Sequence, residues 1–185
     1  MSKKIIKSVL VTGVAGSGKS LVCNKLRDRG YQAYDIEDME GLFSMINKET
    51  RKIAENHDND DLESVKQSDW ICDKKKLRAL IAKRSKNICF YCGTASNLDD
   101  LLTFFDKVIL LVASPETIRK RLAGRKSKDF GSTAEVQEWV LSWKNWWESH
   151  IQEKGAMVIN ADQNINKIVE NIIQKLLLAR PRRLE

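Results

Sequence analysis

The sequence lacks the features that mark membrane, secreted or multidomain proteins. Only two of its 185 residues are proline, Pro115 and Pro181, and no linker, internal repeat or low-complexity segment divides the chain. The longest uncharged apolar stretches, such as residues 108–113, are far shorter than the roughly eighteen residues that a membrane-spanning helix needs. The basic N-terminus has no small-residue cleavage site, so we expect no export signal. These absences favour a single soluble domain over residues 1–179, followed by a flexible tail at 180–185.

Cysteine is scarce, whereas charge is abundant. Four cysteines are too few for a disulfide scaffold, so we expect reduced thiols and a cytoplasmic protein. Cys89 and Cys92 have C-x-x-C spacing, but on a strand their side chains would point to opposite faces, which disfavours a metal site. The 32 Lys and Arg residues exceed the 25 Asp and Glu residues, for a net charge of +7. Such a balance suits a phosphate-bearing ligand or a nucleic acid.

Short apolar runs alternate with helical patterns along most of the chain. Five runs are typical of buried strands: residues 5–11, 31–35, 87–92, 107–112 and 156–160. Three intervening helices have recognisable starts, at Asn97, at Ser114 with Pro115, and at Ser132 with capping-box spacing. Strands separated by helices predict an α/β fold: a parallel five-stranded sheet covered on both faces, hence a three-layer sandwich.

Two segments interrupt this alternation. Residues 36–70 form a polar insertion that we expect to be partly helical, with an acidic cluster, and such excursions often cover a binding cleft. Residues 124–132 form a short basic loop between two predicted helices. Both are candidates for the walls of a site.

The most specific motif begins directly after the first predicted strand. It matches G-x-x-x-x-G-K-[ST] and comprises Gly13, Val14, Ala15, Gly16, Ser17, Gly18, Lys19 and Ser20. The glycines let consecutive backbone N–H groups converge on phosphates at a helix N-terminus. Lys19 can then reach the β- and γ-phosphates, and the Ser20 hydroxyl can ligate Mg²⁺. The motif therefore predicts a P-loop (Walker A) that binds ATP and Mg²⁺.

With this motif and this order of elements, the chain resembles the small P-loop kinases of the nucleoside monophosphate kinase and shikimate kinase group. The resemblance implies a sheet order of 2-3-1-4-5, a substrate-binding insertion at 36–70 and a lid at 124–132. Shikimate kinase-like members end their second strand in Asp-x-Asp, where this sequence has Asp35-Ile36-Glu37. By resemblance, Asp35 lies near Mg²⁺ and the acceptor hydroxyl, and Glu37 or Asp38 touches the substrate. A carboxylate at that position can orient a hydroxyl, although helix capping is the alternative role.

The resemblance extends to the predicted lid. Nucleoside monophosphate kinases carry an Arg-x-x-x-Arg pair there, which Arg121 and Arg125 match. It implies that Arg121 lies against adenine, that Arg125 reaches the transferred phosphate, and that the loop with Asp162 approaches adenine. Arginine suits both roles because its planar fork stacks on rings and binds phosphate oxygens bidentately. A solvated basic face is the alternative.

The chain departs from the kinase pattern at its third predicted strand. Nucleoside monophosphate kinases usually have Asp-Gly there, whereas this sequence has Cys92-Gly93, so the usual Walker B carboxylate is missing. We therefore shift the metal role toward Asp35. Gly93 still permits close approach of a substrate to the backbone.

Two further patterns favour structural roles. Trp139, Trp143 and Trp146, with Trp147 adjacent, recur on one predicted helical face, where core packing or a dimer contact is favoured over base stacking. A basic run at 74–78, continued by Lys83, Arg84 and Lys86, is typical of a solvated helix. Facing a cleft, it would instead attract an anionic acceptor.

The sequence favours a kinase that transfers the γ-phosphoryl of Mg·ATP to a small hydroxyl or phosphate acceptor, such as a nucleoside, a nucleotide or a shikimate-like polyol. The missing Walker B carboxylate leaves a nucleotide-binding switch protein as one alternative. The basic helix leaves a polynucleotide-end kinase as another, so nucleic acid is a partner that the sequence allows without favouring it. The protein would act as a monomer or a homodimer, away from membranes.

Overall fold

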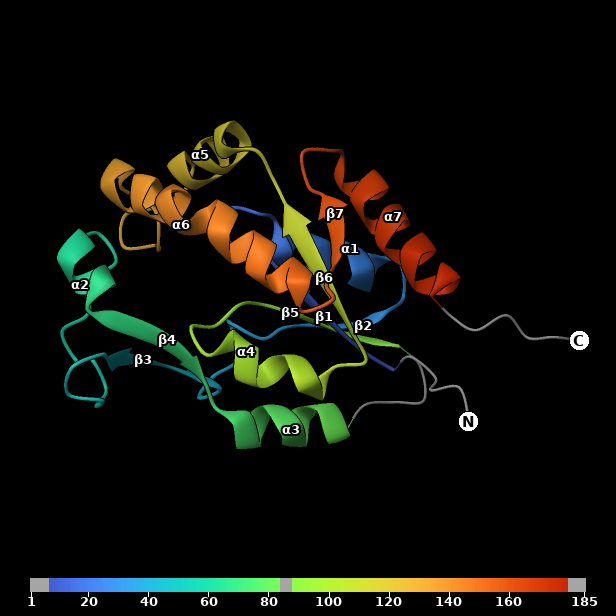
Figure 1. The fold of residues 1–185 in the computed structure, drawn as a ribbon, viewed down its shortest axis with the longest axis horizontal. Helices are drawn as coiled ribbons and strands as arrows, with labels where there is room; N and C mark the ends of the chain where they lie inside the picture. The colour runs from blue at the N-terminus through green and yellow to red at the C-terminus, as the bar shows by residue number, and fades with distance from the viewer. Residues whose placement is uncertain (1–6, 84–87, 180–185) are drawn as a thin grey trace, which may run out of the picture.

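A five-stranded parallel sheet forms the centre of the protein (Figure 1). The computed structural model describes residues 7–83 and 88–179. The strands of this sheet are β1 (Ser8–Thr12), β2 (Gln32–Asp35), β5 (Cys89–Cys92), β6 (Lys107–Val112) and β7 (Met157–Asn160). They are arranged β2-β5-β1-β6-β7 with every pairing parallel. The α/β class is confirmed, and the order is 2-3-1-4-5 when the strands of this sheet alone are counted.

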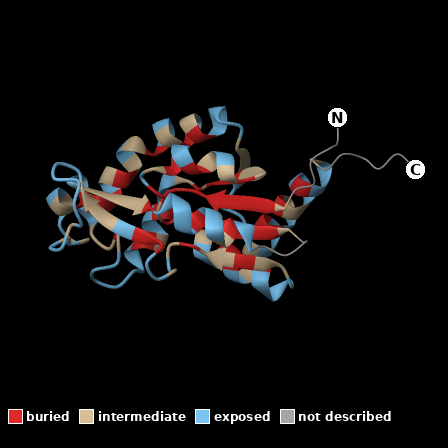
Figure 2. Ribbon diagram, turned by 90° about the horizontal axis from the view of Figure 1, so that it is seen from below, coloured by how far each residue is buried: buried red, intermediate tan, exposed pale blue. Residues whose placement is uncertain are grey.

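Helices cover both faces of the sheet. They are α1 (Lys19–Asp28), α3 (Lys74–Ala82), α4 (Leu98–Leu101), the 3₁₀ turn η1 (Leu102–Phe104), α5 (Pro115–Ala123), α6 (Ala134–Glu153) and α7 (Ile165–Leu178). Alternation along β1 places Val9 and Val11 in one apolar cluster, with α1 and α7, and Leu10 in the other, with α3 and α4. Figure 2 shows the buried residues concentrated along the strands between these layers.

The predicted helix starts have different outcomes. Ser114 caps α5 as expected, its hydroxyl accepting a hydrogen bond from Thr117 N. The α6 cap is Thr133, one residue after the expected Ser132. Asn97 is the N-cap residue of α4 as expected, but its side chain makes no capping hydrogen bond and instead bonds both the N–H and the carbonyl of Cys72. Asn97 thus ties the start of α4 to the insertion.

The insertion is partly helical, as expected, and it also contains strands. It contains a two-stranded antiparallel hairpin, β3 (Phe43–Asn47) with β4 (Ser68–Cys72), and one short helix, α2 (Leu62–Lys66). The hairpin extends to one side of the main sheet, and α2 lies at its far end, near the start of α6 (Figure 1). The insertion therefore forms an arm that faces α6.

Some expectations fall outside the residues that the structure describes. These are the start of the first strand at 5–6, residue 87 of the third, Arg84 and Lys86 of the basic run, and the tail at 180–185. Among the helices of residues 7–83 and 88–179, none combines the length and the apolar character that crossing a membrane requires.

Candidate active site

The P-loop runs from the end of β1 into α1, as the motif predicts. Gly18 precedes the helix with φ of +100°, a conformation that L side chains rarely adopt, and offers no side-chain cap. The first backbone N–H groups of an α-helix have no intrahelical acceptor. At α1 these donors remain for an anion, where the helix dipole also favours negative charge. This is the local geometry of a phosphate site.

Helix α5 packs against the P-loop and hydrogen-bonds its backbone. A Cβ on Gly16, whose φ is +80°, would lie 3.1 Å from Leu122 Cγ, so the loop and helix are in close contact. Arg121 donates hydrogen bonds to the carbonyls of Gly16 (3.2 Å), Ser17 (3.1 Å) and Ala161 (2.8 Å). Arg121 lines the cavity, and its guanidinium braces the P-loop backbone; its predicted contact with adenine stays a prediction.

The side chains of Lys19 and Glu37 form an ion pair beside the P-loop. Lys19 Nζ donates to the carbonyl of Gly13 at 3.1 Å and lies 3.4 Å from Glu37 Oε1. The same Glu37 oxygen accepts a hydrogen bond from Thr94 N at 3.0 Å. Since Thr94 follows β5, Glu37 reaches from the end of β2 to the end of the neighbouring strand. A carboxylate thus lies at the edge of the sheet where the third strand itself carries none.

Gly93 makes this approach possible. A Cβ at that position would lie 2.5 Å from Ile36 Cγ1 and 3.1 Å from Glu37 Cγ. Gly93 therefore lies close to Ile36 and Glu37, and it does not line the cavity.

Asp35, Asp38 and Ser20 provide oxygen atoms near Lys19. Asp35 is the last residue of β2, Ser20 is the second residue of α1, and all three line the same cavity. Within the described ranges, no group of three or more His, Cys, Asp or Glu side chains could hold a metal on its own. The two carboxylates and the Ser20 hydroxyl nevertheless fit Mg²⁺, which is usually bound by one or two carboxylates, waters and substrate phosphates.

The two C-x-x-C cysteines lie on opposite faces of β5. Cys89 belongs to one apolar cluster, and its thiol contacts Gln32 Oε1 at 2.7 Å. Cys92 belongs to the other cluster, where burial raises its pKa well above the ordinary thiol value. The strand alternation expected for this pair is confirmed.

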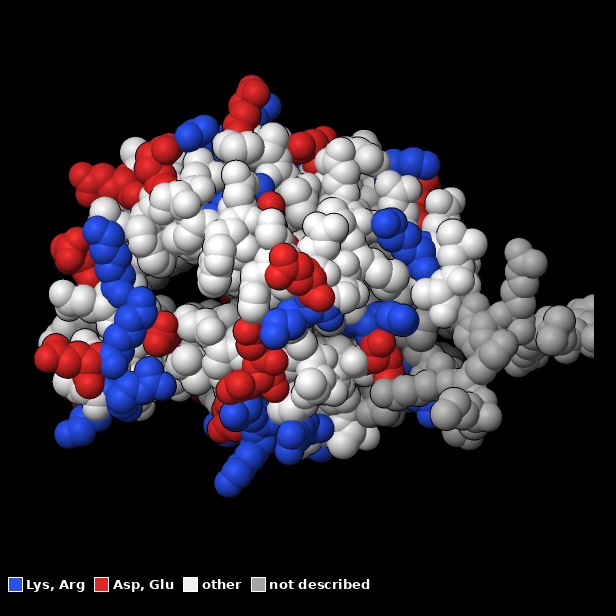
Figure 3. Space-filling model, viewed as in Figure 1, with Lys and Arg blue, Asp and Glu red and all other residues white. Residues whose placement is uncertain are grey.

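A cavity of about 760 Å³ opens from the P-loop toward the insertion and α6. The P-loop and β2 side contributes Val14, Ala15, Gly16, Gly18, Lys19, Ser20, Asp35, Glu37 and Asp38. The insertion contributes Met45, His57, Asn59, Val65, Ser68 and Trp70, and the lid side contributes Arg121, Arg125 and Phe130. Figure 3 shows the molecule hollowed between the hairpin arm and α6, with many uncharged atoms around the opening. The cavity extends well beyond the P-loop.

Three tryptophans of α6 form a wall of this cavity. They are Trp139, Trp143 and Trp147, each half-buried, with edge-to-face contacts at ring-centroid distances of 5.6 and 6.3 Å. The predicted stripe ended at Trp146, but that residue is 69% exposed and stacks on His150. The wall is thus displaced around the helix from the predicted face, and it also faces the cavity, although all three rings pack against the apolar core.

Asp60 joins the insertion to the lid. Its carboxylate accepts hydrogen bonds from Ser127 Oγ, Lys128 N and Ser132 Oγ of the 124–132 loop. These bonds lower the pKa of Asp60, with the Ser132 contact as the largest cause. Asn59 adds a hydrogen bond from Nδ2 to the Lys128 carbonyl at 2.9 Å. The two predicted walls of the site are in direct contact.

Arg125 and Asp162 differ in how they meet the prediction. Arg125 lines the cavity, and its guanidinium donates to the carbonyl of Phe130 within the lid. Asp162 is not among the cavity residues; it accepts hydrogen bonds from the N–H and hydroxyl of Ser114, and the backbone bond is the largest cause of its lowered pKa. Its carboxylate joins the loop after β7 to the start of α5.

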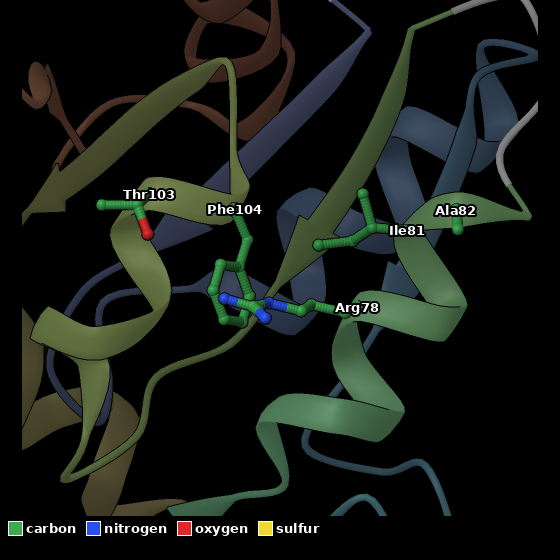
Figure 4. Close-up of a pocket in the computed structure, with 5 residues that line it drawn as sticks. All are labelled: Arg78, Ile81, Ala82, Thr103 and Phe104. Carbon is green, nitrogen blue, oxygen red and sulfur yellow. The ribbon is translucent and has the colours of Figure 1, made fainter.

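A second, smaller hollow of about 330 Å³ lies between α3 and η1, away from the P-loop (Figure 4). The Arg78 guanidinium covers the Phe104 ring at 4.3 Å from its centroid. On the same helix, Lys74 pairs with Asp100 at 3.0 Å and Lys76 donates to the Gly41 carbonyl. Lys74, Lys76 and Arg78 thus have structural partners, and none of the described residues of the basic run lines the main cavity.

The sequence interpretation missed Thr94, Trp70, Phe130 and Asp60. Trp70 and Phe130 gave no signal, since single aromatic residues in polar segments fit no motif. Asp60 was one of several acidic residues in the insertion, and only the packing against the lid distinguishes it.

Several solved structures resemble this chain over most of its length. A deoxyadenosine kinase from M. mycoides with bound dATP is 18% identical, with a TM-score of 0.55 over 92% of this chain and 99% of that chain. TT1252 from Thermus thermophilus is 15% identical, with a TM-score of 0.60 over 97% and 100% of the two chains. A gluconokinase from Sinorhizobium meliloti 1021 is 17% identical, with a TM-score of 0.52 over 96% and 95%. These likenesses show the P-loop kinase-like fold.

A search of curated proteins finds no match. A family model described as an AAA domain matches residues 9–138, more than half of the chain, including the P-loop, the insertion and the lid. The chain therefore belongs to this AAA domain family.

Proposed function

We propose that the protein is an ATP-dependent phosphotransferase that transfers the γ-phosphoryl group to a hydroxyl of a small molecule. The observation that carries this proposal is the position of Glu37, 3.4 Å from Lys19 and at the edge of a cavity that extends beyond the P-loop. A switch protein needs no such compartment beside its nucleotide. The wall residues therefore favour an enzyme with an acceptor over a protein that only binds and hydrolyses ATP.

Each P-loop residue has a role in this reaction. The backbone N–H groups of the loop and α1 bind the triphosphate, and Lys19 moves from the Gly13 carbonyl to the phosphate oxygens. Arg121 keeps the loop in shape through its three carbonyl contacts. Arg125, which donates to the Phe130 carbonyl in this structure, would turn toward the γ-phosphate of bound ATP and so not toward the acceptor. Mg²⁺, held by Ser20, Asp35 and phosphate oxygens, would neutralise developing negative charge.

Glu37 is the proposed base. As the acceptor oxygen bonds to phosphorus and the bond to the β,γ-bridging oxygen of ATP breaks, the hydroxyl proton passes to the Glu37 carboxylate. The hydrogen bond from Thr94 N fixes that carboxylate, and Gly93 leaves space for it. The resemblance implies that Asp35 contacts the acceptor hydroxyl. We instead assign Asp35 to Mg²⁺ alone and contact with the hydroxyl to Glu37.

The described thiols support a reducing compartment. All four cysteines are buried, and none of them forms a disulfide within the described residues, which supports our proposal of a cytoplasmic protein.

The test is ADP release from Mg·ATP with nucleosides, nucleoside monophosphates, sugar acids, polyols and 5′-hydroxyl oligonucleotides as acceptors. Stimulation by one class, lost in Lys19→Ala and Glu37→Gln variants, is the expected result. ATP binding with the same slow turnover for every acceptor would favour the switch protein instead.

A further inference from the structure

We propose that the acceptor is an uncharged nucleoside, whose base stacks on the tryptophan wall while its sugar hydroxyl meets Glu37. The inference rests on the proposed phosphotransferase function and adds the acceptor class. It depends on three properties of the 760 Å³ cavity: its aromatic wall, the sign of its charges and its neutral polar groups.

The aromatic wall offers surfaces for a planar ring. Trp139, Trp143 and Trp147 line one side, and Trp70 of β4, stacked on Phe43 at 5.1 Å, lines the hairpin side. All four indoles are half-buried although they surround a cavity. Stacking on such side chains is tolerant of base identity because every base has a π-face.

The charges of the cavity disfavour an anionic acceptor. No Lys or Arg of the insertion, whose residues 36–70 are all described, lines the cavity, whereas Asp35, Glu37 and Asp38 do. The two lid-side arginines are engaged, Arg121 with three backbone carbonyls and Arg125 with the Phe130 carbonyl. A monophosphate, a sugar acid or an oligonucleotide end would place negative charge against carboxylates without a free basic partner on the insertion side.

Neutral polar groups lie between the aromatic surfaces. His57 contacts Ser68 Oγ at 3.1 Å through Nδ1 and Asn59 Oδ1 at 2.9 Å through Nε2. All three residues line the cavity, as does Ser96. Amide, imidazole and hydroxyl groups can donate to and accept from the edge of a heterocyclic base. Uncharged and cationic acceptors are both compatible with the carboxylates of the cavity. A compact cationic alcohol has no heterocyclic edge for these polar groups to bind, so a nucleoside is favoured.

The experiment compares acceptor classes in wild type and two tryptophan variants. Ribo- and deoxyribonucleosides, their 5′-monophosphates, gluconate and choline are each supplied with Mg·ATP, and ADP and phosphorylated product are measured. At least one nucleoside should raise ADP release tenfold or more and yield a nucleoside monophosphate. Trp143→Leu should raise the KM for that nucleoside about tenfold, with the KM for ATP within about twofold, because one stacking surface is lost.

Trp146→Leu is the matched control, since Trp146 is on the same helix but is 69% exposed and outside the cavity. It should leave both KM values unchanged. Trp139→Leu repeats the test if Trp143→Leu does not give the wild-type circular dichroism spectrum.

Turnover stimulated only by monophosphates, gluconate or choline would overturn the nucleoside assignment and leave the phosphotransferase standing. Equal KM values for Trp143→Leu and Trp146→Leu would overturn the role of the wall. No stimulation by any class, with ATP still bound, would contradict the phosphotransferase itself and this inference with it.

Discussion

Lys19 Nζ lies 3.4 Å from Glu37 Oε1, so the P-loop cation and the carboxylate after β2 are already adjacent. Replacing Glu37 with glutamine preserves size and an oxygen for Thr94 N but removes the proton acceptor. We expect kcat to fall about 10²- to 10⁴-fold while the KM for ATP changes little, because general-base catalysis contributes a factor of that order. Steady-state kinetics with the best acceptor measures this.

The control is Glu40→Gln, which changes an exposed glutamate near by that does not line the cavity. It should retain wild-type kcat. A Glu37→Gln variant with wild-type kcat would remove Glu37 from the chemistry.

Gly93 should not tolerate a methyl group. In Gly93→Ala the new Cβ would meet Ile36 Cγ1 at 2.5 Å, so the end of β2 must shift and Glu37 with it. We expect a loss of about 1–3 kcal/mol in the free energy of unfolding and a fall in kcat of more than tenfold. Gly124→Ala, with its nearest atom at 3.7 Å, is the control for thermal melts and kinetics. Equal behaviour of the two variants would refute the packing argument.

Asp60→Ala should release the lid from the insertion. Removing the acceptor of three lid hydrogen bonds should speed tryptic cleavage at Lys126 or Lys128 several-fold. Glu63→Ala, which removes only an exposed pair with Lys66, is the control. Since the pKa of Asp60 is lowered in the folded protein, its contribution is present above the unfolded pKa and is lost as pH falls through the folded value. Lid cleavage that is equally slow in both variants at neutral pH would mean that the Asp60 hydrogen bonds do not hold the lid to the insertion.

Lys144 and Glu148 form a buried ion pair within α6, at 2.7 Å with side chains 5% and 10% exposed. Lys144→Met would leave Glu148 buried without its partner, so we expect a loss of about 3–5 kcal/mol at pH 7 in denaturant titrations. Burial raises the pKa of Glu148, and a carboxyl with a raised folded pKa gains stability as pH falls through that value. The deficit should therefore shrink toward pH 5.

The double variant Lys144→Met with Glu148→Leu should recover most of the lost stability, since no buried charge remains. A deficit independent of pH, and unchanged in the double variant, would mean that the pair has no such role.

Local patterns were sufficient to predict the P-loop and the sheet. The glycines at 13, 16 and 18 act within one loop, and each buried strand is a short apolar run, so both signals lie within a few residues. Glu37 was harder to assign, because sequence cannot say which of two carboxylates after β2 turns toward Lys19. That choice depends on Thr94, more than fifty residues away.

The insertion and the tryptophan wall depend on contacts that sequence does not reveal. The strands of the β3–β4 hairpin are separated by twenty residues, so no short turn signalled their pairing. Trp146 and Trp147 are adjacent in sequence, and only the packing of α6 against the core decides that Trp147 faces the cavity. The face of a helix that meets a ligand is a property of the assembled layers.

The most direct test of the account follows the γ-phosphoryl group itself. Protein is incubated with Mg·ATP labelled in the γ-phosphate and a mixture of nucleosides, and the label is located after separation of the products. The account predicts label in a nucleoside monophosphate, formed by wild type and lost in Glu37→Gln. Label found only in inorganic phosphate, at a rate that no acceptor changes, would contradict it.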